Sequence, residues 1–211
     1  MKKTILLAAL LNAGIANAAL ITDENFEGGA TGWNNNTTTV GSGVFTEFLG
    51  RHGGTGGNNS LNKSYALSGT QTEVTIEFDF MEIDSWDGES FSFFVDGALL
   101  FSDRFQLSRN DFAGSHAQSL LHGNGTEDLG FSSTWSDQIF HYSITVNTSL
   151  TSLAIGFGTG LNQSIADESW GIDNVRITDN SQVSSVPEPA TLGLIALGMA
   201  GIGFSNRKKA A

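Results

Sequence analysis

An acidic stretch with an aromatic centre, residues 84–89, holds the side chains best suited to bind a ligand. It reads Asp-Ser-Trp-Asp-Gly-Glu, and both Trp86 and Trp135 lie in polar, turn-like sequence. We therefore expect both indole rings to be exposed, where an aromatic face can stack on the C–H face of a sugar while carboxylates accept hydrogen bonds from its hydroxyls. The spacing does not fit an EF-hand, because Trp86 occupies the third position and Gly88 the fifth. A polar loop between two strands is the alternative interpretation of this stretch.

Catalytic signatures are weak throughout the chain. There is no cysteine, no His-Glu-x-x-His zinc motif and no Gly-x-Ser-x-Gly elbow. A pair of carboxylates can still hydrolyse a glycosidic bond, so a secreted polysaccharide hydrolase is the alternative to a non-catalytic binding domain. An ice-binding role has less support, because the only run of threonines is at residues 37–39. We predict that the protein is not an enzyme.

The elements that must position these residues have the pattern of short β-strands. Apolar and polar residues alternate at residues 74–80, 91–95, 140–146 and 153–157, and a last strand is expected at 170–177. Asp96-Gly97 separates two apolar runs and predicts a type I′ hairpin turn. Residues 50–62 have the composition of a Gly/Asn loop, and 110–136 have only a weak pattern. The sequence predicts an all-β protein, a two-sheet antiparallel β-sandwich of jelly-roll type.

Composition limits the partners of this domain. Residues 19–185 contain twenty-one acidic and five basic side chains, a net charge of −16. Such a surface repels nucleic acid, so we expect no nucleic-acid partner. The missing cysteines exclude disulfides, which leaves a hydrophobic core, a bound metal or both to stabilise an exported chain. Acidity of this kind suits calcium, which takes oxygen ligands.

Two short stretches at the ends of the domain carry a resemblance to a known family. Residues 25–33 contain Asn-Phe-Glu-Gly-Gly and Gly-Trp, and residues 170–175 read Trp-Gly-Ile-Asp-Asn-Val. This pairing resembles the two ends of jelly-roll carbohydrate-binding modules. The resemblance implies that the first and last strands lie side by side and that Glu27 and Asp173 help to hold a structural calcium. The alternative is that both are solvated acids at strand ends, and Trp33 and Trp170 are expected to pack inside.

The N-terminus has the features of an export signal. Lys2 and Lys3 precede an apolar run at residues 5–11, and Ala-Asn-Ala at 16–18 provides small residues around a cleavage site. We expect residues 1–18 to be a signal peptide with a short apolar helix. The mature chain then begins at or near Ala19, and the β-sandwich domain spans residues 19–178.

The C-terminus has the features of a membrane-sorting tail. A polar linker, residues 179–189, ends in Pro187-Glu188-Pro189, and residues 190–211 hold an apolar run followed by Arg-Lys-Lys at 207–209. The tail resembles the PEP-CTERM sorting signal of Gram-negative bacteria. The resemblance implies that an exosortase-type membrane protease recognises Pro187, Glu188 and Pro189. The protein would be anchored transiently in the inner membrane and then move to the cell surface or the extracellular polysaccharide matrix.

An ordinary C-terminal membrane anchor is the alternative interpretation of this tail. The apolar segment 190–204 has fifteen residues. As a helix it would measure about 22 Å, against about 30 Å of membrane hydrocarbon. This short transmembrane helix is a marginal span, which suits a transient substrate better than a lasting anchor.

Overall fold

The computed structural model describes residues 18–53, 61–67, 73–106, 116–123, 127–131 and 135–180. These residues belong to one compact unit, Ala18–Ser181. They form eleven β-strands and no helix. Within these ranges no helix is long and apolar enough to cross a membrane. The predicted signal helix, the C-terminal helix and the Pro-Glu-Pro motif lie outside the described residues.

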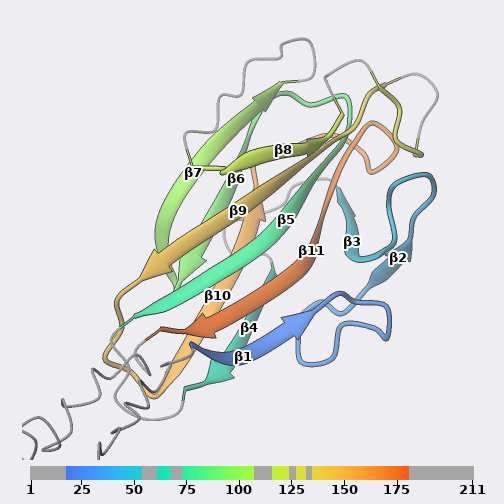
Figure 1. Ribbon diagram of the computed structural model, residues 1–211. Coiled ribbons are helices and arrows are strands. Elements are labelled where there is room, and N and C mark those ends of the chain that lie inside the picture. The colour runs from blue at the N-terminus through green and yellow to red at the C-terminus, as the bar shows by residue number, and fades with distance from the viewer. Residues whose placement is uncertain are drawn as a thin grey trace, which may run out of the picture. The chain divides into compact units, whose positions relative to one another are not determined.

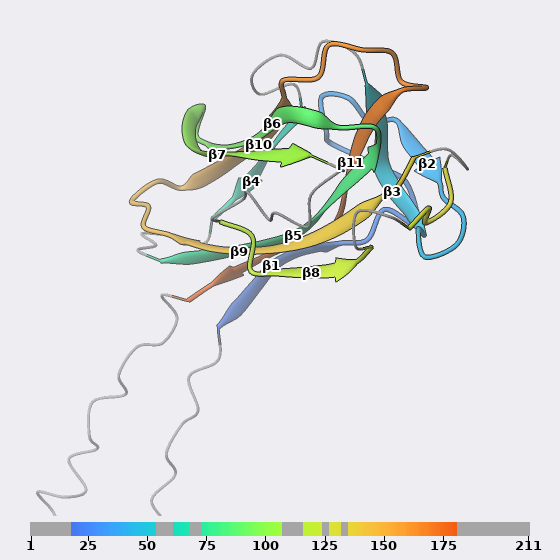
Figure 2. The ribbon, with the colours of Figure 1, turned by 90° about the horizontal axis from the view of Figure 1, so that it is seen from above.

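Two antiparallel sheets form the unit, and they face each other as two layers (Figures 1 and 2). The larger sheet has the order β2-β3-β11-β5-β9-β8, and β1 also pairs with β11. Its strands are β1 (Ala19–Glu24), β2 (Thr38–Val40), β3 (Glu47–Gly53), β5 (Val74–Asp84), β8 (Ser119–His122), β9 (Gln138–Val146) and β11 (Glu168–Asp179). The smaller sheet has the order β4-β10-β6-β7. Its strands are β4 (Leu61–Ala66), β6 (Asp87–Val95), β7 (Ala98–Gln106) and β10 (Ser152–Thr159). The predicted all-β, two-sheet antiparallel sandwich is confirmed.

The first and last strands lie side by side, as the resemblance at the domain ends implied. β1 pairs with β11 in antiparallel register, with Ala19 opposite Asp179, so the chain enters and leaves the unit at the same end. The first residues of the expected linker are held on the sandwich. Asp179 is the last residue of β11, and the Asn180 backbone N–H donates to the carbonyl oxygen of Glu73 at 2.9 Å.

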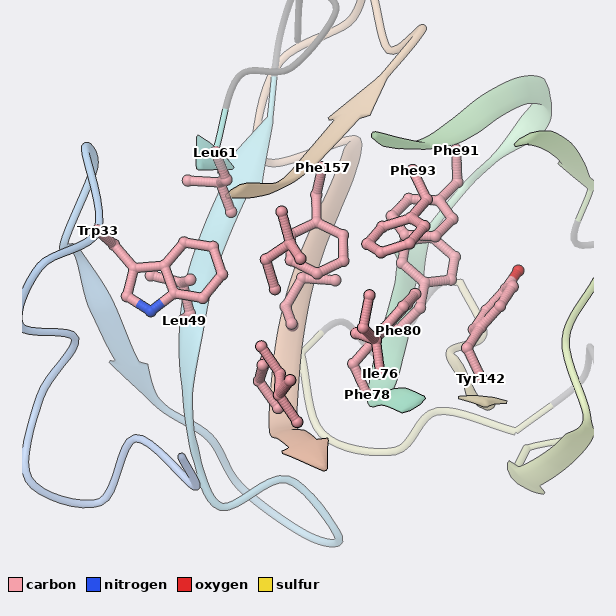
Figure 3. Packing of buried hydrophobic residues seen from close by; sticks show 14 of the residues in the cluster. Trp33, Leu49, Leu61, Ile76, Phe78, Phe80, Phe91, Phe93, Tyr142 and Phe157 are labelled. Atoms are coloured by element: carbon pink, nitrogen blue, oxygen red, sulfur yellow. The ribbon is translucent and has the colours of Figure 1, made fainter. Parts of the chain in front are cut away.

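Aromatic side chains fill the space between the sheets (Figure 3). Phe80 from the larger sheet stacks on Phe91 from the smaller sheet, with 4.0 Å between ring centroids. Phe78 stacks on Tyr142 at 4.9 Å, and all four rings are buried. Such pairs add to the stabilisation that comes from burying apolar area. The unit therefore has a hydrophobic core of its own and is expected to fold without the segments outside it.

The strongly alternating segments are strands, as predicted: they lie in β5, β6, β7, β9, β10 and β11. The hairpin turn between β6 and β7 is also confirmed, since Asp96 and Gly97 have φ angles of 50° and 78°. The loop expected at residues 50–62 is wrong at both ends, because β3 continues to Gly53 and β4 begins at Leu61. β3 includes a glycine and charged or polar residues after Leu49, which hides the alternation on which strand prediction depends.

Candidate functional site

The loops that carry the predicted ligand-binding residues meet at one end of the sandwich. Glu168, the first residue of β11, pairs with Asp84 at the end of β5, whereas Asp179 pairs with Val74 at the start of β5. The β5–β6 and β10–β11 connections are therefore at the end opposite the chain entry and exit (Figure 1). At about 3.3 Å per residue, β11 separates the two ends by roughly 36 Å. We call the end with these connections the distal end.

An exposed tryptophan stands beside a hollow at the distal end. Trp135 precedes β9 and is 47% exposed, as the sequence predicted. With Trp135, the polar side chains of Asp87, Gln163 and Asp167 line a pocket of about 320 Å³. The Ser85 hydroxyl donates to the Asp167 carboxylate at 3.0 Å, which fixes that acid in the wall. An aromatic face and several hydrogen-bonding side chains thus share one concave site, the Trp135 pocket.

Trp86 is buried, so the prediction that its ring is exposed is wrong. It lies in the wall of the same pocket but is only 1% exposed, and its Nε1–H donates to the backbone oxygen of Ser169 at 2.8 Å. The ring packs edge-on against Phe80 and Phe105 in the core. The β5–β6 connection has only two residues, and it directs the indole inward although the neighbouring side chains are polar. A sugar cannot stack on a buried ring, so Trp86 does not have the glycan-binding role predicted for it.

The other two tryptophans are buried, in agreement with the sequence. Trp33 is 5% exposed and stacks on Phe157, and Trp170 is 1% exposed. The Trp33 Nε1–H donates to the Glu24 carboxylate at 2.9 Å, so its polar atom is satisfied.

Buried carboxylates support the walls of the distal end. Asp84 forms an ion pair with Arg51, whose Nε–H also donates to the Ser169 hydroxyl at 2.6 Å. Asp137 accepts hydrogen bonds from the backbone N–H groups of Asp84, at 3.0 Å, and Leu129, at 2.9 Å. Burial raises the pKa of Asp137 to about 6, although these two bonds act in the opposite direction. The network connects β5, β3 and the start of β9 and keeps the loops in place.

Three further carboxylates converge beside the Trp135 pocket. One oxygen from each of Asp87, Glu89 and Glu168 lies within 4.8 Å of the others. Burial, followed by the charges of Glu89 and Asp87, raises the pKa of Glu168 to about 7. The sequence drew attention to residues 84–89, but it gave no indication of Glu168. That residue joins them only because β11 pairs with β5 and thereby starts at the same end.

The predicted calcium ligands lie near each other, Glu27 in the turn after β1 and Asp173 on β11 of the larger sheet. The Thr46 hydroxyl donates to Asp173 at 3.2 Å, and the next residue, Glu47, donates its backbone N–H to Glu27 at 3.1 Å. Burial, together with the charges of Asp79 and Glu27, raises the pKa of Asp173 to about 7. The sequence missed Asp79, which lies directly opposite Asp173 in the β5–β11 register. Both Asp79 oxygens already have partners, His141 Nδ1 at 2.7 Å and Asn174 Nδ2 at 2.8 Å, so calcium at Glu27 and Asp173 stays a prediction.

Two of the three hydroxyl groups of the threonine run are engaged within the protein. Thr38 donates to the Glu47 carboxylate and Thr39 to the carbonyl oxygen of Gly50, both at 2.6 Å. These hydroxyls are therefore not arranged as a free, regular array, and nothing at this site favours ice binding.

Comparison with known proteins assigns the C-terminal tail. Residues 185–208 match the PEP-CTERM protein-sorting motif. The tail is a PEP-CTERM sorting signal. It includes Pro187, Glu188 and Pro189, the residues predicted from the sequence for recognition. A tail of this type marks an exported protein that is anchored in the membrane transiently. No curated protein matches the chain significantly.

Several solved structures resemble the β-sandwich at low sequence identity. Latent PorU from Porphyromonas gingivalis matches 82% of this chain with 14% identity and a TM-score of 0.47, and the chain covers only 13% of PorU. A family 35 carbohydrate-binding module from Clostridium thermocellum matches 74% of this chain and 95% of its own, at 12% identity and a TM-score of 0.40. The C-terminal family 6 module of LamC from Zobellia galactanivorans matches 75% of this chain and 98% of its own, at 18% identity and a TM-score of 0.38.

Proposed function

We propose that the β-sandwich binds extracellular polysaccharide without catalysis, at the Trp135 pocket. The observation that carries the proposal is the 47% exposed indole of Trp135, set beside a pocket lined by Asp87, Gln163 and Asp167. The indole supplies an apolar face for a sugar ring, and the carboxylate and amide groups supply the acceptors and donors that its hydroxyls need. A single aromatic platform on an acidic surface favours a neutral or weakly charged glycan over a polyanionic one.

The position of this pocket suits a surface protein. The tail leaves the unit after β11, and the pocket lies at the distal end, roughly 36 Å away along the strand. In our proposal an exosortase-type protease recognises Pro187-Glu188-Pro189 at the inner membrane of a Gram-negative bacterium and removes the anchor. The released domain is then retained on the cell surface or in the exopolysaccharide matrix through its glycan contacts.

A polysaccharide hydrolase is the second candidate, because Glu168 and its neighbours offer a carboxyl group of raised pKa next to other carboxylates. A general acid must reach the glycosidic oxygen to protonate it. Glu168 has no exposed surface, so its carboxyl group does not reach a bound chain. The geometry therefore favours binding over hydrolysis.

Calcium at Glu27 and Asp173 completes the proposal as a structural cofactor. Its position near the β1–β11 pairing would connect the segment after β1 to the last strand, in a domain that has no disulfide. Calcium neutralises the repulsion between Glu27, Asp173 and Asp79 and supplies no catalytic chemistry in this role.

Binding of the purified domain, residues 19–185, to a polysaccharide array tests the proposal. We expect retention on at least one extracellular polysaccharide and a loss of at least tenfold in affinity for Trp135→Ala. Leu150→Ala is the matched control, because Leu150 is equally exposed, at 48%, and lies in the β9–β10 turn at the opposite end. Equal weakening by both variants, or turnover of the bound polysaccharide, would contradict the proposal.

A further inference from the structure

Three carboxylates from both sheets converge at the distal end, beside the Trp135 pocket. Asp87 and Glu89 belong to β6 in the smaller sheet, and Glu168 is the first residue of β11 in the larger sheet. One oxygen from each lies within 4.8 Å of the others. Gly88, between the two acids of β6, has a φ of 125°, a conformation that side-chain-bearing residues rarely adopt. The chain therefore adopts a glycine-specific conformation where these acids meet.

Glu168 has a second, independent feature that points to a ligand. It is completely buried; its Oε1 accepts a hydrogen bond from Gln163 Nε2 at 2.9 Å, and the backbone N–H of Asn162 also donates to the carboxylate group. Its Oε2 has no hydrogen-bond partner among the residues that the structure describes. A buried carboxylate oxygen without a donor is costly, because it loses its hydration and gains nothing in return. A bound cation would provide the missing partner.

The charges around the three acids do not neutralise them. Arg104 on β7 directs its Nε–H to the carbonyl oxygen of Gly88 at 2.9 Å, and Arg51 is paired with Asp84. Asp167, in the β10–β11 connection and in the wall of the adjacent Trp135 pocket, adds another negative charge. The group therefore retains a surplus of negative charge close to a buried carboxylate, which favours binding of a divalent cation.

We propose that Asp87, Glu89 and Glu168 bind a divalent cation of the calcium type. Calcium–oxygen distances are about 2.3–2.6 Å, so two oxygens on opposite sides of one ion are at most about 5 Å apart. The three oxygens fall within this limit, since none is more than 4.8 Å from another. Three carboxylates leave several coordination positions for water or a hydroxyl group. A hollow lined by Glu89, Ser90 and Asn162 gives access to the group from solvent. This site is separate from Glu27 and Asp173 and does not depend on glycan binding.

Calcium titration by calorimetry tests the site in the domain of residues 19–185. Asp173→Asn is used as the parent, so that the site at Glu27 does not contribute. We expect the parent to bind one calcium ion and Glu89→Gln to reduce its affinity at least tenfold. Asp23→Asn, which removes an exposed acid on β1, is the control and should bind as the parent does.

Glu168→Gln provides a second variant, with circular dichroism to establish that each protein is folded. It should also weaken binding at least tenfold. If Glu168→Gln does not fold, Glu89→Gln decides the outcome, because Glu89 is only partly buried. A parent that binds no calcium, or a folded Glu89→Gln variant that binds it unchanged, would overturn the proposal.

Discussion

Replacing Trp86 by phenylalanine separates a structural tryptophan from a ligand-binding one. The structure buries the Trp86 indole against Phe80 and Phe105 and gives its N–H a partner in the backbone oxygen of Ser169. Phenylalanine preserves an aromatic ring in this position but lacks the donor and the second ring. We therefore expect Trp86→Phe to destabilise the domain while leaving the Trp135 pocket able to bind glycan.

The expected decrease in the free energy of unfolding has two contributions. Removing a hydrogen bond to a buried acceptor costs about 1–3 kcal/mol. Losing the extra ring atoms removes buried apolar area and leaves a small cavity, which costs about 1–2 kcal/mol more. The sum is about 2–5 kcal/mol in the free energy of unfolding. For a domain of this size, that corresponds to a decrease in melting temperature of roughly 5–15 °C.

Urea denaturation of the two matched variants measures this difference. Trp135→Phe makes the same chemical change at a 47% exposed site and should alter the free energy of unfolding by less than about 0.5 kcal/mol. Glycan binding should show the opposite order, with Trp135→Phe weaker than Trp86→Phe at a temperature where both are folded. Equal destabilisation by the two substitutions would show that Trp86 is not a core residue and would refute the assignment.

Three further predictions concern charge and sorting. Burial raises the pKa of Glu82 to about 8, so its contribution to stability is complete below about pH 4.5 and is lost as the pH rises through 8. Glu82→Gln should therefore exceed the wild type in unfolding free energy by roughly 4–5 kcal/mol at pH 9 and match it near pH 4 in urea titrations. Calcium at a hundred times its dissociation constant should stabilise the domain by about 2.7 kcal/mol for each occupied site, and Asp173→Asn should remove the contribution of the Glu27 site. Equal melting temperatures in calcium and EDTA would exclude both calcium sites. Replacing Pro187 and Pro189 by alanine should trap a larger, membrane-bound form, visible by immunoblotting of membrane fractions, whereas unchanged release would argue against recognition of the Pro-Glu-Pro motif.

Patterns among neighbouring residues were sufficient to predict the central strands and to recognise the sorting tail. The alternation at residues 74–80 and 140–146 identified β5 and β9, because a strand with one buried face must alternate apolar and polar side chains. Asp96-Gly97 identified its turn because a type I′ conformation requires positive φ at both positions. The sorting signal could also be recognised from the sequence, because the residues of its motif are contiguous.

Short or irregular strands could not be predicted from alternating apolar and polar residues. β2 has three residues and β8 has four, too few to show a reliable alternation. All four residues of β8 are exposed, so burial imposes no pattern on them. β1 was placed beside β11 only through the resemblance at the domain ends, not through periodicity.

The site itself was decided by tertiary structure. The polar neighbours of Trp86 predicted an exposed ring, but a two-residue connection between strands on opposite sheets turns that ring into the core. Glu168 joins Asp87 and Glu89 across about eighty residues of sequence, through the register of β11 against β5. The sequence alone determined the central strands, the acidic charge and the sorting motif of the tail, because each depends on neighbouring residues. The tertiary structure determined which rings are exposed and which carboxylates meet, because those depend on how distant strands pair.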